Sequence, residues 1–188
     1  MPNKILLILS FVVSSLLELH AQSPYHIEGG LFYGSTVQTE SPENQFVTLL
    51  GFEKPTVNAQ IGVGYSRYLF KQLGCGIDVL YSLTGYASSY TKRNFQHYLA
   101  VQPFLSYTFQ DKWRIKGGLS MDLLVYPKYY NSNRFEFGTA WNVQRILGKY
   151  AIGLKFERYF TPHTTDAFGS ASYKMYHKQI GLTLSRSF

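Results

Sequence analysis

The chain has 188 residues, of which 45% are hydrophobic and 17% aromatic but only 15% charged. Its mean hydropathy of -0.12 shows that the apolar residues are dispersed, which argues against a helical membrane protein built from apolar runs of about 20 residues. The formal charge of +7 comes from scattered Lys and Arg residues, so no basic helix forms and nucleic acid is not an expected partner.

Residues 1–21 differ from the rest of the chain. Lys4 precedes an apolar run over residues 5–13, and Ala21 stands before Gln22. This order of charge, apolar run and small residue is typical of a secretory signal peptide cleaved after Ala21. A membrane anchor is the alternative, although the run is short for a span. We therefore expect residues 1–21 to be removed on export and residues 22–188 to fold as one domain.

Alternation of apolar with small or polar residues dominates residues 22–188. Ile61, Val63 and Tyr65, for example, alternate with Gly62 and Gly64, which is the pattern of a strand with one apolar face. The pattern occurs in eight segments, centred on residues 27–33, 61–65, 75–83, 99–109, 115–125, 135–143, 152–156 and 180–188. The sequence therefore predicts eight strands.

The links between these strands alternate in length. Short links fall near residues 67–72, 110–112 and 145–149, and long polar links near residues 38–55, 84–94, 127–133 and 161–174. Such alternation predicts an all-β, antiparallel up-and-down barrel with tight turns at one end. Strands of roughly ten residues suit a tilted transmembrane barrel. We expect both termini at the short-turn, periplasmic end.

Charged residues decide which face points inward. A soluble barrel of the lipocalin kind would place its apolar face inside. Here the apolar face carries charge only near strand ends, at Arg67, Arg158, Lys178 and Arg186, where long side chains can reach water. The polar face carries charges in mid-strand, and we predict that these form a lumen charge network: Glu28, Asp78, Arg114, Lys116, Asp122, Glu136, Lys155 and Glu157.

Aromatic residues gather near the strand ends, as in the interfacial girdles of membrane barrels. One group is predicted beside the short turns and the other toward the long loops. The first contains Tyr65, Tyr68, Phe70, Tyr107, Phe109 and Trp113, and the second Tyr126, Tyr129, Tyr130, Tyr159 and Phe160. Ordinary core packing in a small sandwich is the alternative, but so many Tyr hydroxyls would each need a buried partner.

The C-terminal stretch 179–188 resembles the signal by which the outer-membrane assembly machinery recognises its clients, with Phe188 last and Leu184 and Leu182 before it. The Ala21–Gln22 junction resembles Bacteroidota export signals. Further motifs follow in order: residues 98–107, Gly117-Gly118-Leu119, Phe135-Glu136-Phe137-Gly138 and Arg158-Tyr159-Phe160. Together they resemble the porin-family outer-membrane barrels of the Bacteroidota that include PorT of the type IX secretion system.

This resemblance implies an outer-membrane location in a Gram-negative bacterium. Its implied partners are outer-membrane lipid and lipopolysaccharide, the assembly machinery and other envelope proteins, such as a secretion machine.

Catalysis is not expected. A lipid A deacylase of the PagL kind needs a His-x-Ser pair and a downstream Glu. The nearest match, His163-Thr164-Thr165, lacks the serine, and Asp166 is the one carboxylate that follows. A palmitoyltransferase of the PagP kind needs a hydrocarbon-lined interior, which a charged lumen does not provide. The sequence therefore predicts a non-enzymatic protein without a cofactor.

The remaining candidate residues predict no site. His26, His97 and His177 are spread over three strands, and we interpret them as hydrogen-bonding groups and not metal ligands. Cys75 is interpreted as a small hydrophobic residue. Eight strands leave an interior just wide enough for side chains, so a structural or interaction role is favoured. A lipid-modifying enzyme and a narrow solute pore stay open as alternatives.

Overall fold

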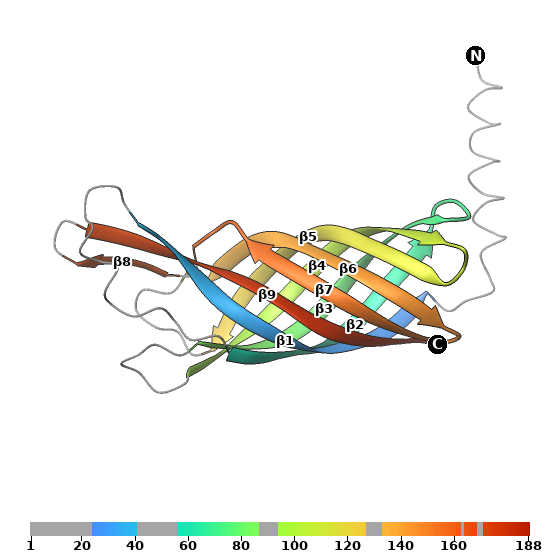
Figure 1. The fold of residues 1–188 in the computed structure, drawn as a ribbon, viewed down its shortest axis with the longest axis horizontal. Coiled ribbons are helices and arrows are strands. Elements are labelled where there is room, and N and C mark those ends of the chain that lie inside the picture. Colours follow the sequence, from blue (N-terminus) through green and yellow to red (C-terminus); the bar gives the residue numbers. More distant parts are fainter. Residues whose placement is uncertain (1–23, 41–55, 87–93, 127–132, 163, 169–170) are drawn as a thin grey trace, which may run out of the picture.

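The computed structural model describes residues 24–40, 56–86, 94–126, 133–162, 164–168 and 171–188. Eight long strands form a closed antiparallel barrel (Figure 1). They are β1 (Tyr25–Glu40), β2 (Thr56–Tyr68), β3 (Leu73–Tyr86), β4 (Asn94–Phe109), β5 (Trp113–Tyr126), β6 (Phe135–Leu147), β7 (Tyr150–Tyr159) and β9 (Ala171–Ser187). Neighbours in sequence pair with each other, and β9 pairs with β1 to close the ring. The predicted fold class is confirmed.

One predicted loop contains regular structure. Within residues 161–174, β8 (Thr164–Phe168) pairs antiparallel with the first residues of β9. Residues 35–40 of β1 continue to pair with β9 beyond the last pairing with β2. These segments extend past the other strands at the long-loop end, at the left of Figure 1. The polar composition of residues 164–174 concealed this hairpin, because strands outside the main barrel wall need no continuous apolar face.

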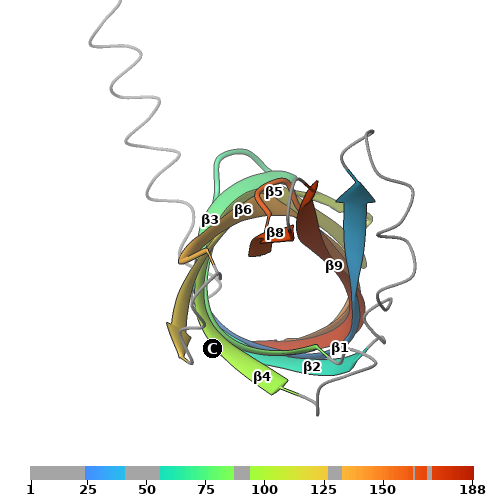
Figure 2. The same ribbon diagram turned by 90° about the vertical axis from the view of Figure 1, so that its left-hand side faces the viewer.

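The alternation of side chains sets the inside and the outside of the barrel. Leu31, Ile61 and Leu182 are more than 60% exposed on the outer face. Residues between the outward positions point into the barrel. Figure 2 shows the ring of strands from the long-loop end. There Gln102 is 3% exposed and Ser120 fully buried. The core of this barrel is therefore polar and its surface apolar, the reverse of the lipocalin arrangement.

Apolar rings also fill part of the interior, which the alternation pattern alone did not indicate. Phe32 and Phe104 are both buried inside the barrel. A Cβ atom on Gly181 would overlap the ring of Phe32, and one on Gly76 would overlap the ring of Phe104. Glycine at these inward positions gives each ring the room that a narrow barrel otherwise lacks.

The predicted short links are tight turns at one end of the barrel. Gln110 and Asp111 join β4 to β5 with φ angles of 51° and 52°, and Gly148 joins β6 to β7 with φ of 65°. Glycine adopts this left-handed conformation at little cost, and short polar residues such as Asp tolerate it. In the part of the chain that the structure describes, no helix is long and apolar enough to cross a membrane.

A closed strand ring predicts heat-modifiable electrophoretic mobility. Every barrel strand has a partner on both sides, so no edge is available from which cold detergent can open the ladder. The protein should run as a compact band without boiling and shift to lower mobility after boiling. Identical mobility before and after boiling would contradict a closed barrel.

Candidate functional site

Five carboxylates and two lysines are buried inside the barrel. They are seven of the eight residues of the predicted lumen network: Glu28, Asp78, Asp122, Glu136 and Glu157, with Lys116 and Lys155. Each is at most 5% exposed. Burying a charge is costly unless it is paired and hydrogen-bonded, so the contacts of these groups decide whether the fold can contain them.

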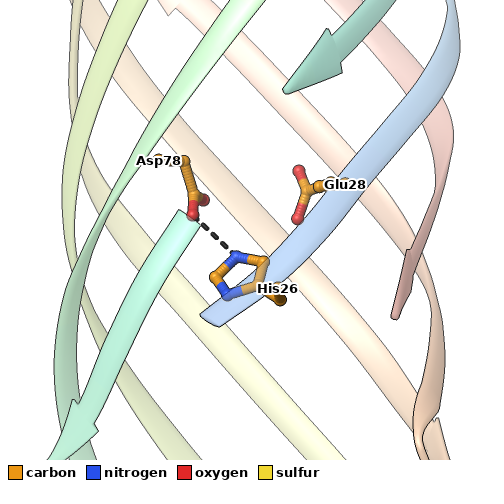
Figure 3. Close-up of side chains that lie close together, drawn as sticks. All are labelled: His26, Glu28 and Asp78. Carbon is orange, nitrogen blue, oxygen red and sulfur yellow. Dashed lines mark hydrogen bonds and ion pairs between the residues drawn. The ribbon is translucent and has the colours of Figure 1, made fainter. Parts of the chain in front are cut away.

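The first cluster lies toward the short-turn end and centres on Lys116. Its ammonium group lies 2.6 Å from a carboxylate oxygen of Asp78 and 3.3 Å from one of Glu28. The ring of His26 lies 2.8 Å from the other oxygen of Asp78, a contact drawn in Figure 3. Gly64 faces this contact, and a Cβ atom there would overlap both His26 and Asp78. The glycine therefore makes room for the pair.

His26, Glu28 and Asp78 converge in a way that the sequence analysis missed. One ligand-type atom from each lies within 4.8 Å of the other two, and Figure 3 shows the three side chains pointing toward one another from β1 and β3. The two-residue spacing of His26 and Glu28 was a usable signal, because it places both on one face of a strand. Lys116 already supplies a cation to both carboxylates, so the cluster is an ion-pair cluster.

The second cluster lies in the middle of the lumen. The Lys155 ammonium lies 3.1 Å from Glu157, 3.5 Å from Glu28 and 3.1 Å from the amide oxygen of Gln60. The Glu157 carboxylate also accepts hydrogen bonds from Gln60 at 2.9 Å and Gln102 at 2.8 Å, and from Gln179. Such full satisfaction is the condition under which a buried charge network stabilises a fold.

The third cluster lies toward the long-loop end, where carboxylates meet hydroxyl groups. Asp122 accepts hydrogen bonds from Tyr159 at 2.8 Å and Ser120 at 2.6 Å. Glu136 accepts one from Tyr98 at 2.7 Å and lies 2.9 Å from the ring of His177.

The placement of Tyr159 corrects its assignment to the outer aromatic girdle, because it is 5% exposed and faces the lumen. Its position two residues after Glu157 on β7 gives it the same inward direction, a signal that the aromatic pattern obscured.

Arg114 is the predicted network residue that the structure places differently. It faces inward but is half-buried beside the short turn, where its guanidinium donates to the Tyr68 hydroxyl at 3.3 Å. Tyr68 is thereby also an inward residue and not a girdle residue. Arg114 follows the first residue of β5, so its side chain reaches the rim of the barrel and not the clusters of buried acids.

The other candidate residues of the sequence lie outside these clusters. His97 faces outward on β4, where its ring nitrogen contacts the Tyr81 hydroxyl and a register shift separates it from Tyr98. Cys75 is a free, half-buried thiol. The enzyme candidates around His163, and residues 1–21, lie outside the residues whose side chains the structure describes.

A small cavity remains beside the first cluster. It has a volume of about 20 Å³ and is lined by charged groups, among them Glu28, Asp78, Lys116 and Lys155, together with apolar groups such as Phe104. This is room for about one water molecule. Polar side chains make up most of the buried residues in the described part of the lumen.

These features define a class: a small closed antiparallel barrel with a polar, ion-paired interior and an apolar outer surface. No family model matches the sequence, and no curated protein matches it.

Solved structures that align with this chain include the attachment invasion locus protein Ail of Yersinia pestis. Its TM-score is 0.41, with 11% identity over 86% of this chain and 99% of Ail. The outer-membrane protein AlkL has a TM-score of 0.43 and 12% identity over 89% of this chain and 92% of AlkL. The NanC porin has a TM-score of 0.36 and 10% identity over 84% of this chain and 98% of NanC.

The first cluster predicts a large effect of neutralising Lys116. Lys116→Met leaves Asp78 and Glu28 buried with less compensating charge, so it should destabilise the barrel by about 3–5 kcal/mol. Denaturant titration of the detergent-folded protein measures this cost. Lys149→Met, in an exposed turn, is the control and should change stability by less than about 0.5 kcal/mol. Equal unfolding midpoints for the two variants would contradict the pairing.

Proposed function

We propose that the chain is a small integral outer-membrane β-barrel protein of a Gram-negative bacterium, non-enzymatic, with a structural or interaction role in the cell envelope. The observation that carries this proposal is the outer face of the barrel, where large apolar side chains are exposed on all eight strands. Examples are Leu31 at 65%, Leu105 at 58%, Leu154 at 52% and Leu184 at 55%. An apolar surface that surrounds a protein is suited to lipid. A closed barrel also satisfies its own backbone hydrogen bonds, as a membrane requires.

Aromatic side chains at both ends of this surface support the same proposal. Exposed rings beside the short turns are Tyr25, Tyr65, Phe70, Tyr107, Tyr150 and Phe188. Exposed rings toward the long loops are Tyr33, Tyr81, Phe95, Tyr126, Phe135 and Phe160. Between the two levels the surface is mainly aliphatic, with the exposed rings of Trp141 and Phe156 among the aliphatic side chains. Two aromatic levels of this kind match the two interfaces of a bilayer.

Export and assembly complete the proposal. Residues 1–21 act as a signal peptide, and both termini of the folded protein lie on the periplasmic side with the short turns. Leu182 and Leu184 are exposed on the outer side of β9, and Phe188 is exposed just after its end. There the assembly machinery can bind them as the strand pairs with β1. The resemblance of its motifs supports a relation to the PorT-like barrels of the Bacteroidota. Lipid, lipopolysaccharide and other envelope proteins are its partners.

Two other functions give different experimental results. A lipid-modifying enzyme would change the mass of lipid A when its gene is deleted, and a narrow solute pore would conduct ions steadily after reconstitution. The packed clusters of the lumen support neither outcome. The deciding experiment is crosslinking in whole cells followed by purification. Envelope proteins crosslinked to the intact chain in defined amounts support an interaction role. In the separate deletion experiment, an altered lipid A mass contradicts the non-enzymatic proposal.

A charge on the outer face tests the membrane orientation. Val101→Arg places a charge on the apolar side of β4, between the inward residues Ala100 and Gln102. It should destabilise the membrane-folded barrel by about 2–4 kcal/mol, which denaturant titration in lipid vesicles measures. Leu69→Arg, in the exposed turn after β2, is the control and should have little effect. A harmless Val101→Arg would mean that this face does not meet lipid.

A further inference from the structure

Charge is divided between the inside and the outside of the barrel. Six acidic side chains are described by the structure, and five of them are buried in the lumen; the sixth, Asp111, lies in an exposed turn. Among the residues whose side chains the structure describes, the outward positions of the strands therefore carry cations but no acids. Among the described side chains, the excess positive charge accordingly lies at the outer surface and at the ends of the barrel.

Among the side chains that the structure describes, most cations outside the lumen lie at the short-turn end. Seven Lys or Arg side chains lie there: Arg67, Lys71, Lys112, Arg114, Arg145, Lys149 and Arg186. Four of them, Lys112, Arg145, Lys149 and Arg186, are exposed along the adjacent strands β5, β6, β7 and β9 and their turns. We call these four residues the basic patch.

Two arginines of the basic patch lie against aromatic rings. The Arg145 guanidinium lies 5.7 Å from the ring centroid of Trp113, its cross-strand partner. The Arg186 guanidinium lies 5.7 Å from the ring of Tyr150, also its cross-strand partner, and 5.6 Å from that of Phe188. Such contacts hold a guanidinium in place while its donors stay available to an anion.

Apolar side chains continue directly from the basic patch along the same strands. Arg145 pairs with Ile152, which pairs with Leu184, and both apolar side chains are about half exposed. A ligand of matching shape has an anionic head at the level of the arginines and hydrocarbon at the level of Ile152 and Leu184.

We propose that the basic patch binds the headgroups of anionic phospholipids, with their acyl chains on the neighbouring aliphatic surface. This inference rests on the proposed membrane function and adds the lipid class and the site. An acidic protein or a nucleic acid would match the charge but not the adjoining apolar surface. Anionic lipid satisfies both, because cations near a bilayer surface attract acidic headgroups and aromatic residues favour the same depth.

Tryptophan quenching in vesicles tests the proposal. The chain has two Trp residues, so the Trp141→Phe variant leaves Trp113, beside Arg145, as the one reporter. The full chain is reconstituted in phosphatidylcholine vesicles that contain brominated phosphatidylglycerol or brominated phosphatidylcholine. We expect the phosphatidylglycerol to associate more tightly, and Arg145→Gln with Arg186→Gln to lower this preference by about fivefold per arginine.

The same strands provide a matched control. Arg158 and Lys178 are exposed cross-strand partners on β7 and β9 toward the long-loop end. Arg158→Gln with Lys178→Gln removes equal charge and should leave the preference at Trp113 unchanged. If the Arg145 and Arg186 double variant does not fold, Lys112→Gln with Lys149→Gln in the exposed turns makes the same test.

The outcomes separate this inference from the proposed function. Equal quenching by both lipids, or an unchanged preference in the basic-patch variants, overturns the inference. Loss of the preference in inorganic phosphate, but not in chloride of equal ionic strength, shows a site for the free anion and also overturns it. Protein that does not float with either kind of vesicle contradicts the membrane function itself.

Discussion

The interior of an eight-stranded barrel is so narrow that every inward side chain touches others, and here many of those side chains are charged. Five carboxylates and two lysines lie in this space, where the cost of an unpaired charge is high. The remaining structure follows from this constraint. Gln60 donates to the Glu157 oxygen that Lys155 does not contact, and Gln102 donates to the oxygen that it does contact. Gly64 is small, so that His26 can meet Asp78.

The same constraint separates stability from specificity in this fold. Replacing a buried ion pair by apolar residues is often neutral or stabilising, whereas removing one partner is costly. The charged groups of the lumen therefore serve mainly to specify one pairing register of the strands. Lys155 contacts Glu28 on β1 as well as Glu157 on its own strand. A register slip of one residue would turn each of these groups toward the apolar face.

Alternation in the sequence was sufficient to predict the number of barrel strands, the lengths of most links and the direction of most side chains, because each depends on residues close in the chain. Contacts across the lumen were not predictable in the same way. Asp78 meets His26 only because the registers of β1, β2 and β3 bring them level, and register is a property of pairs of strands. The sequence assigned Arg114 correctly to the inward face of its strand, but not to its position at the rim of the barrel. The β8 hairpin was missed because its residues show no alternation of apolar side chains.

The pairing of β1 with β9 runs from His26 to Glu40, farther than β1 pairs with its other neighbour. These strands lie at opposite ends of the described chain, so joining them costs the most chain entropy of any contact in the ring. Until β1 and β9 pair, the open sheet has two edge strands whose unpaired backbone groups can bind another chain. Here the longer pairing adds backbone hydrogen bonds between β1 and β9, which make the closed ring hard to reopen. The molecule therefore offers neighbouring chains little opportunity to exchange strands once it has closed.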